Sequence, residues 1–380
     1  MLKKAYEILI LIICSIALVG CWDYRDIDQK CVVVSIGVDK VKNMIEFSGE
    51  VAQFASSKEK GEKAQVANVY NMESLGKTFG EARKNYDSSN PFPLFLGAAR
   101  VVVFGQDYAK EGIGSYLNRV DRTTDYRKTV LAVVSKEKPS ILLNTDTQKD
   151  IAVGFLIENI IGYLENKGRS IYSTVGDLLS DIELQQAGYV MPYIGMKKDN
   201  ISYLGLAVMK DSKLIDIIDE KNTQGMLYLL VKNLSSFEGI EEIENKNNKY
   251  SFLISIKKRK IKIDYEKNIP VIYIDLDLDA QLSYQYYREH LHKKNIEKLE
   301  KEISKKQKQK IQQIIQKAQK EYKCDIFGFA EYFRAQHIQE YEKMKWREIF
   351  PNSKVVIRVN TKIINTNLVN QNVKEKVTEE

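Results

Sequence analysis

The sequence predicts a mixed α+β protein, in which an N-terminal α/β domain is followed by a C-terminal domain of antiparallel sheet packed by a long amphipathic helix. Three observations support this fold class. Strand-like and helix-like patterns alternate over residues 31–186, apolar and polar residues alternate over 250–284, and an apolar stripe at helical spacing runs through 288–322. With 44% hydrophobic residues among 380, the chain can bury the cores of two domains or three small ones.

The N-terminus has the pattern of a bacterial lipoprotein signal. Two lysines precede an apolar run at residues 8–20, which gives about 20 Å of helix against a hydrocarbon core of ~30 Å. Leu18-Val19-Gly20-Cys21 closes this run in the order of a lipobox. We expect residues 1–20 to be a lipoprotein signal peptide, and Cys21 to carry a diacylglyceryl anchor with acyl chains such as palmitate. The alternatives are a plain signal peptide and an uncleaved anchor.

The N-terminal α/β domain is expected over residues 21–198. β-branched residues predict strands at 31–38 and 45–54, joined by a polar turn, and a loop at 58–65 leads to a helix at 73–86. The remaining elements alternate: strand 98–104, helix 106–119, strand 129–135, and helices 139–143, 151–165 and 174–186.

Pro192 and the polar residues 197–200 mark the boundary to a C-terminal α+β domain at residues 199–370, with a polar tail at 371–380. This domain can be divided further into 199–248 and 249–370. Its predicted elements follow in order: strands 201–209 and 214–218, helix 220–230, strands 250–256, 260–265 and 271–284, helices 288–322 and 330–347, and strand 354–364.

The helix predicted at 288–322 carries an uneven charge, because residues 293–323 hold 11 Lys and four Glu. A solvated face is the usual meaning of such a run, and attraction to anionic lipid headgroups or to an acidic partner is the alternative. Lys306, Gln307 and Lys310 interrupt the apolar stripe, so we expect the helix to project past the sheet edge there. The rest of the mature chain is nearly neutral, which argues against nucleic acid as a partner.

Aspartates at alternate positions imitate a calcium loop without completing it. Asp275, Asp277 and Asp279 resemble the first ligands, but Ala280 replaces the required glycine and Tyr286 replaces the bidentate glutamate. We therefore expect a solvated strand face and no metal site.

Histidines and cysteines offer no catalytic arrangement either. His290 and His292 would point about 200° apart on a helix, and the chain has no Gly-x-Ser-x-Gly or His-Glu-x-x-His motif. Cys31 and Cys324 are expected as two buried or idle thiols, with a disulfide between them as the alternative. We predict no catalytic residue and no cofactor.

The segment that begins at the lipobox cysteine resembles a known family. Cys21-Trp-Asp-Tyr-Arg-Asp-Ile27 is similar to the mature start of the Ger(x)C lipoproteins, the C subunits of spore germinant receptors, with Asp26 in place of the usual Glu. Phe95-Leu-Gly97 departs from the family, which often has a histidine there. Further similarities follow in family order: Ser35 to Asp39, Val102 to Tyr116, Gly205 to Met209, Cys324 to Phe329, Trp346, and Phe350-Pro351.

This resemblance implies a non-enzymatic receptor subunit in the spore inner membrane, lipid-anchored with its body on the outer side. Its implied partners are the integral membrane subunits of the receptor and, through the anchor, membrane lipid. The alternative function is a lipid-anchored solute-binding protein that captures the nutrient itself, which requires two similar lobes and a cleft. Among the shared residues, Asp325 is expected to cap a helix or turn, and Phe329 and Trp346 are expected to pack in a cluster that closes the C-terminal domain.

Overall fold

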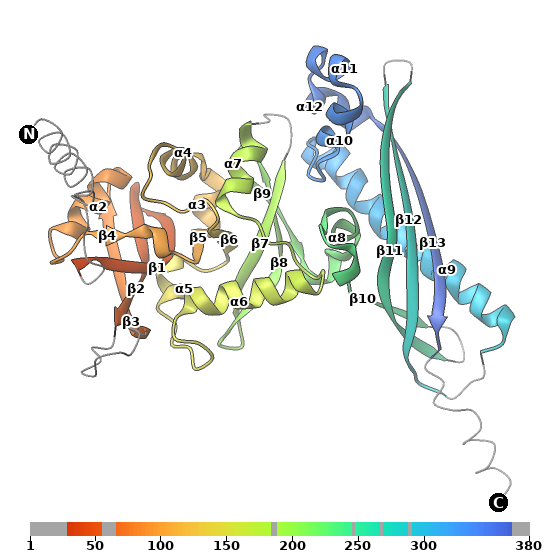
Figure 1. The fold of residues 1–380 in the computed structure, drawn as a ribbon, viewed down its shortest axis with the longest axis horizontal. Coiled ribbons are helices and arrows are strands. Elements are labelled where there is room, and N and C mark those ends of the chain that lie inside the picture. Colours follow the sequence, from red (N-terminus) through yellow and green to blue (C-terminus); the bar gives the residue numbers. More distant parts are fainter. Residues whose placement is uncertain are drawn as a thin grey trace, which may run out of the picture.

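The structure, a computed structural model, describes residues 29–54, 66–183, 188–244, 248–266, 269–287 and 291–366. Within these residues the chain forms a nine-stranded sheet and a four-stranded sheet at opposite ends of the molecule, with helices packed on both (Figure 1). The predicted mixed α+β class is confirmed, including the long C-terminal helix. The loop expected at 58–65 and the tail expected at 371–380 lie outside the described residues.

The nine-stranded sheet has the order β3-β2-β1-β5-β6-β7-β8-β9, with β4 paired to β1. Strands β1, β5, β6 and β7 are parallel to their neighbours in the centre, and antiparallel pairs complete both sides. The strands are β1 (Cys31–Val41), β2 (Met44–Phe54), β3 (Val66–Gly76), β4 (Leu94–Phe95), β5 (Val101–Gly105), β6 (Leu131–Ser135), β7 (Tyr189–Lys197), β8 (Asn200–Lys210) and β9 (Lys213–Asp219).

Helices cover both faces of this sheet, which explains its continuous apolar strands. Every residue of β5 is buried, because Val101 and Val103 face one core while Val102 and Phe104 face the other. One face packs against α2 (Phe79–Asp87), α3 (Gln106–Glu111), α4 (Gly114–Arg122) and α7 (Val175–Glu183), and the other against α5 (Pro139–Leu143) and α6 (Val153–Asn166).

A buried carboxylate joins α6 to the sheet. The Glu50 side chain on β2 accepts hydrogen bonds from the backbone N–H of Val153 at 2.7 Å and of Gly154 at 2.8 Å, and from the Ser35 hydroxyl at 2.7 Å. Ala152, which precedes the helix, has no side chain that could cap it. Glu50 therefore supplies the N-terminal cap of α6 from a distant strand, although burial raises the pKa of its carboxyl.

The four-stranded sheet has the order β10-β11-β12-β13. Its first three strands are antiparallel, as expected, but β13 lies parallel to β12, so the prediction of a purely antiparallel sheet is wrong for the last strand. The elements are β10 (Gly239–Glu244), β11 (Lys249–Glu266), β12 (Ile269–Gln285), α9 (Lys293–Lys317), a π-helical turn (Ala318–Tyr322), α10 (Phe329–Gln336), α11 (Ile338–Lys343), α12 (Trp346–Ile349) and β13 (Lys354–Asn365).

Several predicted elements are corrected by the structure. The helix expected at 73–86 starts only at Phe79, because β3 continues to Gly76 and the Thr78 hydroxyl accepts from the Glu81 N–H. The helix expected at 106–119 is divided into α3 and α4, and the one expected at 330–347 into α10, α11 and α12. Strands 250–256 and 260–265 are one strand with an irregularity after Ile256, and β7 and β10 were not predicted.

The predicted domain boundary at residue 198 falls in the turn between β7 and β8, which pair with each other along their length. The first sheet therefore continues to Asp219, at the end of β9. We propose that the two units meet at α8 (Gln224–Leu230), because one apolar core runs from α6 and β8 through this helix to the second sheet and α9.

Helix α8 lies unusually close to the middle of α9. A side chain at Gly225 would place its Cβ 2.5 Å from the Lys310 carbonyl oxygen, so only glycine permits this approach. Beside it, Gln307 is fully buried and bonds Tyr228 at 3.0 Å and Glu241 at 2.7 Å, and Lys310 pairs with Glu241. The expected projection of the helix at Lys306, Gln307 and Lys310 is therefore wrong, because polar partners on α8 and β10 receive these residues.

We predict that Gly225→Ala lowers the free energy of unfolding by about 1–3 kcal/mol, since the backbone of α9 must move to admit the new Cβ. Gly162→Ala is the matched control, because Gly162 also lies in a helix but has open space around its Cβ position. That variant should gain about 0.5–1 kcal/mol from helix propensity. Urea denaturation measures both, and equal effects of the two substitutions would contradict the close contact.

Candidate functional site

The predicted C-terminal cluster exists and is organised by Asp325. This side chain is fully buried, and its Oδ1 accepts from the Phe327 N–H at 2.9 Å. Its Oδ2 accepts from the Ala330 N–H at 2.7 Å and from the Trp346 indole N–H at 3.1 Å. Burial raises the pKa of Asp325 to about 6, although the three donors favour the carboxylate. The expectation that Asp325 caps a helix is confirmed, because Ala330 lies in the first turn of α10.

Aromatic rings close this cluster around the capped helix. Trp346 is fully buried and stacks on Phe333 with 5.2 Å between ring centroids, and Phe350 and Phe329 lie beside them. Gly328 adopts φ 74°, which lets the chain turn sharply into α10. The predicted packing roles of Trp346 and Phe329 are confirmed, so this shared motif builds the core of the C-terminal unit.

A cleft of about 400 Å³ lies next to the cluster, between the two units. The first unit contributes α7, the start of β7 and the segment before α7, and the second contributes β11 and the start of α10. The Gly188 N–H donates to the Asp325 carbonyl at 2.7 Å, so backbone atoms of both units meet at its edge. Its lining includes the charged residues Asp177, Asp181, Lys232, Arg259 and Glu331.

Two of these charged residues form hydrogen bonds with backbone groups of the protein. The Arg259 guanidinium donates to the carbonyls of Tyr228 at 3.1 Å and Leu229 at 2.8 Å, which satisfies the C-terminal end of α8. Asp177 accepts from the N–H of Thr174 at 2.9 Å and from its hydroxyl at 2.7 Å, which caps α7. These groups therefore hold the walls of the cleft in place.

Asp181 is the most perturbed acid of the cleft. Its pKa rises to about 7, first because the carboxyl is withdrawn from water, and second because Glu331 and Asp177 add negative charge nearby. Lys232 opposes this rise only weakly, since its side chain is 83% exposed. The cleft can therefore change charge near neutral pH. No motif in the sequence indicated it, because α7 and α10 come together only in the fold.

A row of three aspartates lies on the outward face of β12, as expected for a solvated strand face: Asp275, Asp277 and Asp279. Basic residues on the neighbouring strands face it, and Arg358 pairs with Asp275 at 3.4 Å. Across the described residues, no group of three or more His, Cys, Asp or Glu side chains is placed to hold a metal ion.

The cysteines and histidines of the described residues are dispersed over the fold. Cys31 and Cys324 are buried free thiols, and burial raises the pKa of Cys324 to about 11. His337 contacts the Ile263 carbonyl oxygen through Nε2 at 3.1 Å. His290 and Cys21 lie outside the described residues, so the lipidation of Cys21 stays a prediction. None of the helices in the described part of the chain combines the length and hydropathy needed to span a bilayer.

Two family models match the chain in succession. The spore germination protein N-terminal domain matches residues 23–196, and the C-terminal domain of spore germination B3/GerAC-like proteins matches residues 204–367. The two matches meet near the turn between β7 and β8.

Curated relatives match over nearly the full length. The chain is 23% identical to spore germination protein KC of Bacillus subtilis (strain 168), with 99% of both chains covered. It is 22% identical to spore germination protein B3 of the same organism, with 96% of this chain and 98% of the relative covered. The crystal structure of the GerBC protein has a similar fold, with a TM-score of 0.58, 19% identity, and coverage of 87% of this chain and 97% of that one.

We predict that Asp181→Asn stabilises the protein increasingly as the pH rises from about 4 to about 7. The folded-state pKa of about 7 exceeds the ordinary value of 3.8, so only the folded state binds a proton between these two values. The parent therefore loses stability as the pH rises from about 4, and the loss is complete once the pH has passed about 7. The stability difference from the parent should grow by up to about 1.4 kcal/mol per pH unit in this window. Urea denaturation at several pH values measures it. Asp146→Asn, on an exposed loop, is the control, and the same pH dependence in both variants would contradict the assignment.

Proposed function

Because this chain belongs to the Ger(x)C family of spore germination proteins, we propose that it is the lipid-anchored, non-enzymatic C subunit of a nutrient germinant receptor in the spore inner membrane. The observation that carries this proposal is the pair of family matches, which together extend from residue 23 to residue 367. The body of the protein lies on the outer side of the membrane, and the integral membrane subunits of the receptor are its partners.

Within the receptor, we propose a role in assembly or signalling, with nutrient capture left to other subunits. The cleft between the units supports this, because Arg259 and Asp177 already bind the backbone of α8 and of the α7 start. The two units also differ in architecture, with a nine-stranded mixed sheet covered by helices on both faces in one and a four-stranded sheet packed by α9 in the other. A two-lobed solute-binding protein would need similar lobes that close on a ligand.

Direct nutrient binding is the second candidate, and one observation favours it. Among the described residues, the side chains of Asp181 and Glu331 form no hydrogen bond, and Lys232 makes only a long ion pair with Asp177, at 3.8 Å. Both signs of charge are therefore available to a small zwitterion. An ammonium group would face the two carboxylates, and a carboxylate would face the lysine.

We predict that an affinity-tagged chain, extracted from spores with mild detergent, brings the integral membrane subunits with it. Mass spectrometry identifies them, and a tagged unrelated lipoprotein is the control. In parallel, calorimetric titration of the unacylated chain with amino acids and sugars should release no heat of binding. Saturable binding that Asp181→Asn abolishes, together with an absence of co-purifying subunits, would replace this proposal by the solute-binding alternative.

We predict that Cys21→Ala retains the precursor and blocks acyl labelling. The thiol of Cys21 is the acceptor of the diacylglyceryl group, and alanine offers no nucleophile in its place. Labelled palmitate and N-terminal analysis of the mature chain are the measurements. Cys14→Ala is the matched control, because Cys14 lies in the same apolar run but follows Ile13 where a small residue is needed. Label in the Cys21 variant, or a mature N-terminus elsewhere, would refute the anchor.

A further inference from the structure

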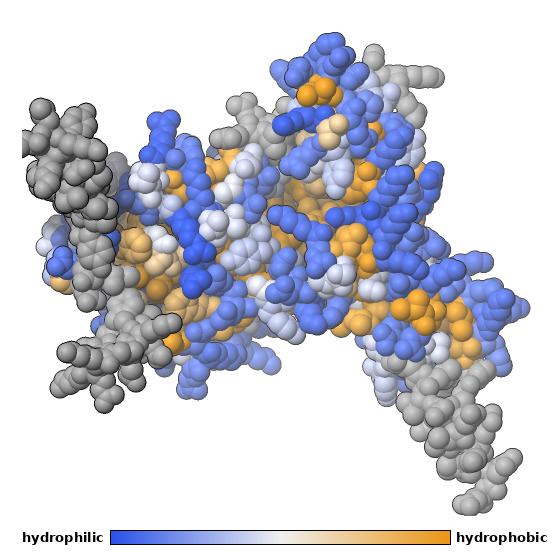
Figure 2. Space-filling model, in the orientation of Figure 1, coloured by the Kyte–Doolittle hydropathy of each residue, from blue (hydrophilic) through white to orange (hydrophobic). Residues whose placement is uncertain are grey.

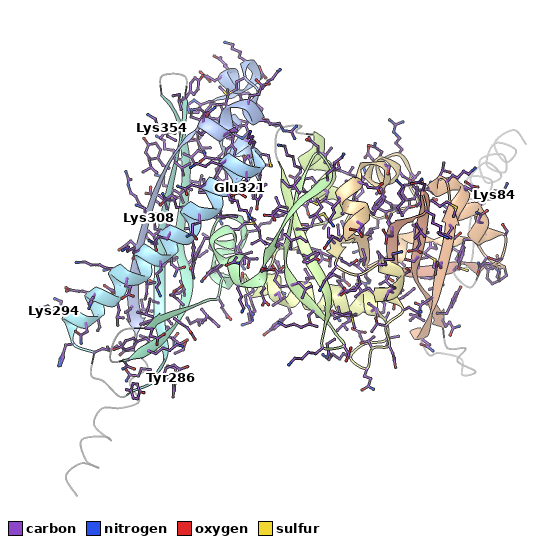
Figure 3. All side chains as sticks on the ribbon, turned by 180° about the vertical axis from the view of Figure 1, so that it is seen from behind. Lys84, Tyr286, Lys294, Lys308, Glu321 and Lys354 are labelled. Atoms are coloured by element: carbon purple, nitrogen blue, oxygen red, sulfur yellow. The ribbon has the colours of Figure 1, made fainter. Side chains whose placement is uncertain are left out.

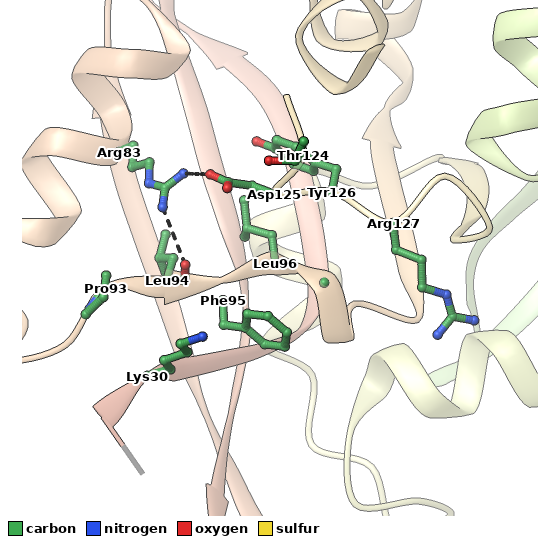
Figure 4. A pocket seen from close by; sticks show the side chains of 11 residues that line it. Lys30, Arg83, Pro93, Leu94, Phe95, Leu96, Thr124, Asp125, Tyr126 and Arg127 are labelled. Atoms are coloured by element: carbon green, nitrogen blue, oxygen red, sulfur yellow. Dashed lines mark hydrogen bonds and ion pairs between the residues drawn. The ribbon is translucent and has the colours of Figure 1, made fainter. Parts of the chain in front are cut away.

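An open hollow of about 600 Å³ lies at the end of the molecule where β1 begins (Figure 4). Hydrogen bonds fix its floor, because the Cys31 N–H donates to the Pro93 carbonyl at 3.0 Å and β4 pairs with the first residues of β1. Lys30, immediately before β1, and Phe95 on β4 therefore lie next to each other. Arg83 on α2 completes one wall, where it pairs with Asp125 at 2.5 Å.

The hollow has an excess of positive charge. Lys30 and Arg127 line it, and neither has a carboxylate within ion-pair distance among the described residues. The Lys30 ammonium lies 4.9 Å from the centroid of the Phe95 ring, which leaves its remaining side open. Among the residues that the structure describes, the Arg127 side chain donates to the Thr129 hydroxyl alone, at 2.5 Å. Since Asp125 is already neutralised by Arg83, the charges of Lys30 and Arg127 remain available to anions, on opposite sides of the hollow (Figure 4).

Exposed aromatic rings accompany these cations. Phe95 is 36% exposed at the hollow, and Phe92, on the segment that leads into β4, is 40% exposed. Apolar and hydrophilic residues are intermixed on the visible surface at this end of the molecule (Figure 2). Phenyl rings beside cations suit the boundary between headgroups and acyl chains, whereas a soluble anion would gain nothing from them.

We propose that this hollow rests on the phosphates of anionic membrane lipids, with Lys30 and Arg127 at separate headgroups and Phe92 and Phe95 against the adjoining apolar layer. Lys30 lies nine residues after Cys21, so an extended connection spans at most about 30 Å. Because the anchor would hold the hollow within that distance of the membrane, even weak contacts with headgroups would bind it there. The inference rests on the proposed function only for the presence of the membrane beside this end of the molecule.

The lysines of α9 are the competing lipid surface, and their position argues against them. Lys294 and Lys308 lie at the opposite end of the molecule from Lys84 on α2, the helix that also carries Arg83 (Figure 3). Lys306 and Lys310, in the middle of α9, also pair with Glu241. A membrane that holds the start of β1 therefore reaches the hollow before it reaches α9.

The test uses the mature chain with Cys21→Ser, which lacks the acyl chains, and vesicles of phosphatidylcholine with phosphatidylglycerol in low salt. Co-sedimentation measures how much protein binds to the vesicles. In the double variant Lys30→Gln with Arg127→Gln, binding should fall about fivefold for each of the two cations removed. Lys305→Gln with Lys308→Gln removes the same charge from exposed positions on α9 and should leave binding unchanged. Phe95→Ala should weaken binding at high salt as well, because apolar contact is not screened. Lys30→Arg with Arg127→Lys keeps the charge and should keep the binding.

Equal losses in the two double variants would mean unspecific attraction and would overturn the site. So would unchanged binding by the Lys30 and Arg127 variant, provided that its thermal unfolding midpoint equals that of the parent. Inorganic phosphate should not displace the vesicles at the same ionic strength, and displacement would assign the hollow to a free anion. Failure of acyl labelling at Cys21 is a separate result, because the chain used here carries no acyl group.

Discussion

The close approach of α8 to α9 is the contact through which the second half of the structure is placed relative to the first. At Gly225 the two helices are so near that the Lys310 carbonyl occupies the space of a side chain. The apolar core passes through this contact without interruption, and Tyr228 and Gln307 bond each other at its centre. Arg259 binds the last carbonyls of α8 from the second sheet, so this short helix is fixed from both sides. This contact therefore determines where the cleft and the aromatic cluster around Trp346 lie relative to the first unit.

Buried carboxylates have a structural use in both units. Glu50 and Asp325 each accept backbone N–H groups at the start of a helix, α6 in one case and α10 in the other. An isolated charge at such depth would be very costly, and the hydrogen bonds of the helix terminus together with its dipole offset that cost. Raised pKa values at these positions therefore reflect burial within the architecture. Asp181 differs, because other carboxylates surround it and no donor among the described residues compensates.

The sequence predicted those features that depend on residues close to one another along the chain. The β-branched run at 31–38, the apolar stripe of α9 and the compact Cys324–Phe329 motif could all be predicted from the sequence, since each depends on neighbours close along the chain. The burial of Gln307 could not, because its partners Tyr228 and Glu241 are distant in sequence. For the same reason the sequence did not indicate that Lys30 and Arg127 line one hollow. The parallel pairing of β13 was also missed, since strand direction follows from the connection and not from alternation.

The position of β13 has a consequence for how the protein is made. This strand pairs with β12 along eleven registered positions, yet the long helix α9 and the aromatic cluster separate the two strands in the chain. One edge of β12 consequently stays without its partner until the ribosome has also synthesised α9 to α12 and β13. An unpaired edge of that length is a template for joining to another chain, so premature stop codons before residue 354 would yield aggregating products. The completion of this sheet thus depends on residues 354–365, so a truncation just before them should harm folding about as much as an early one.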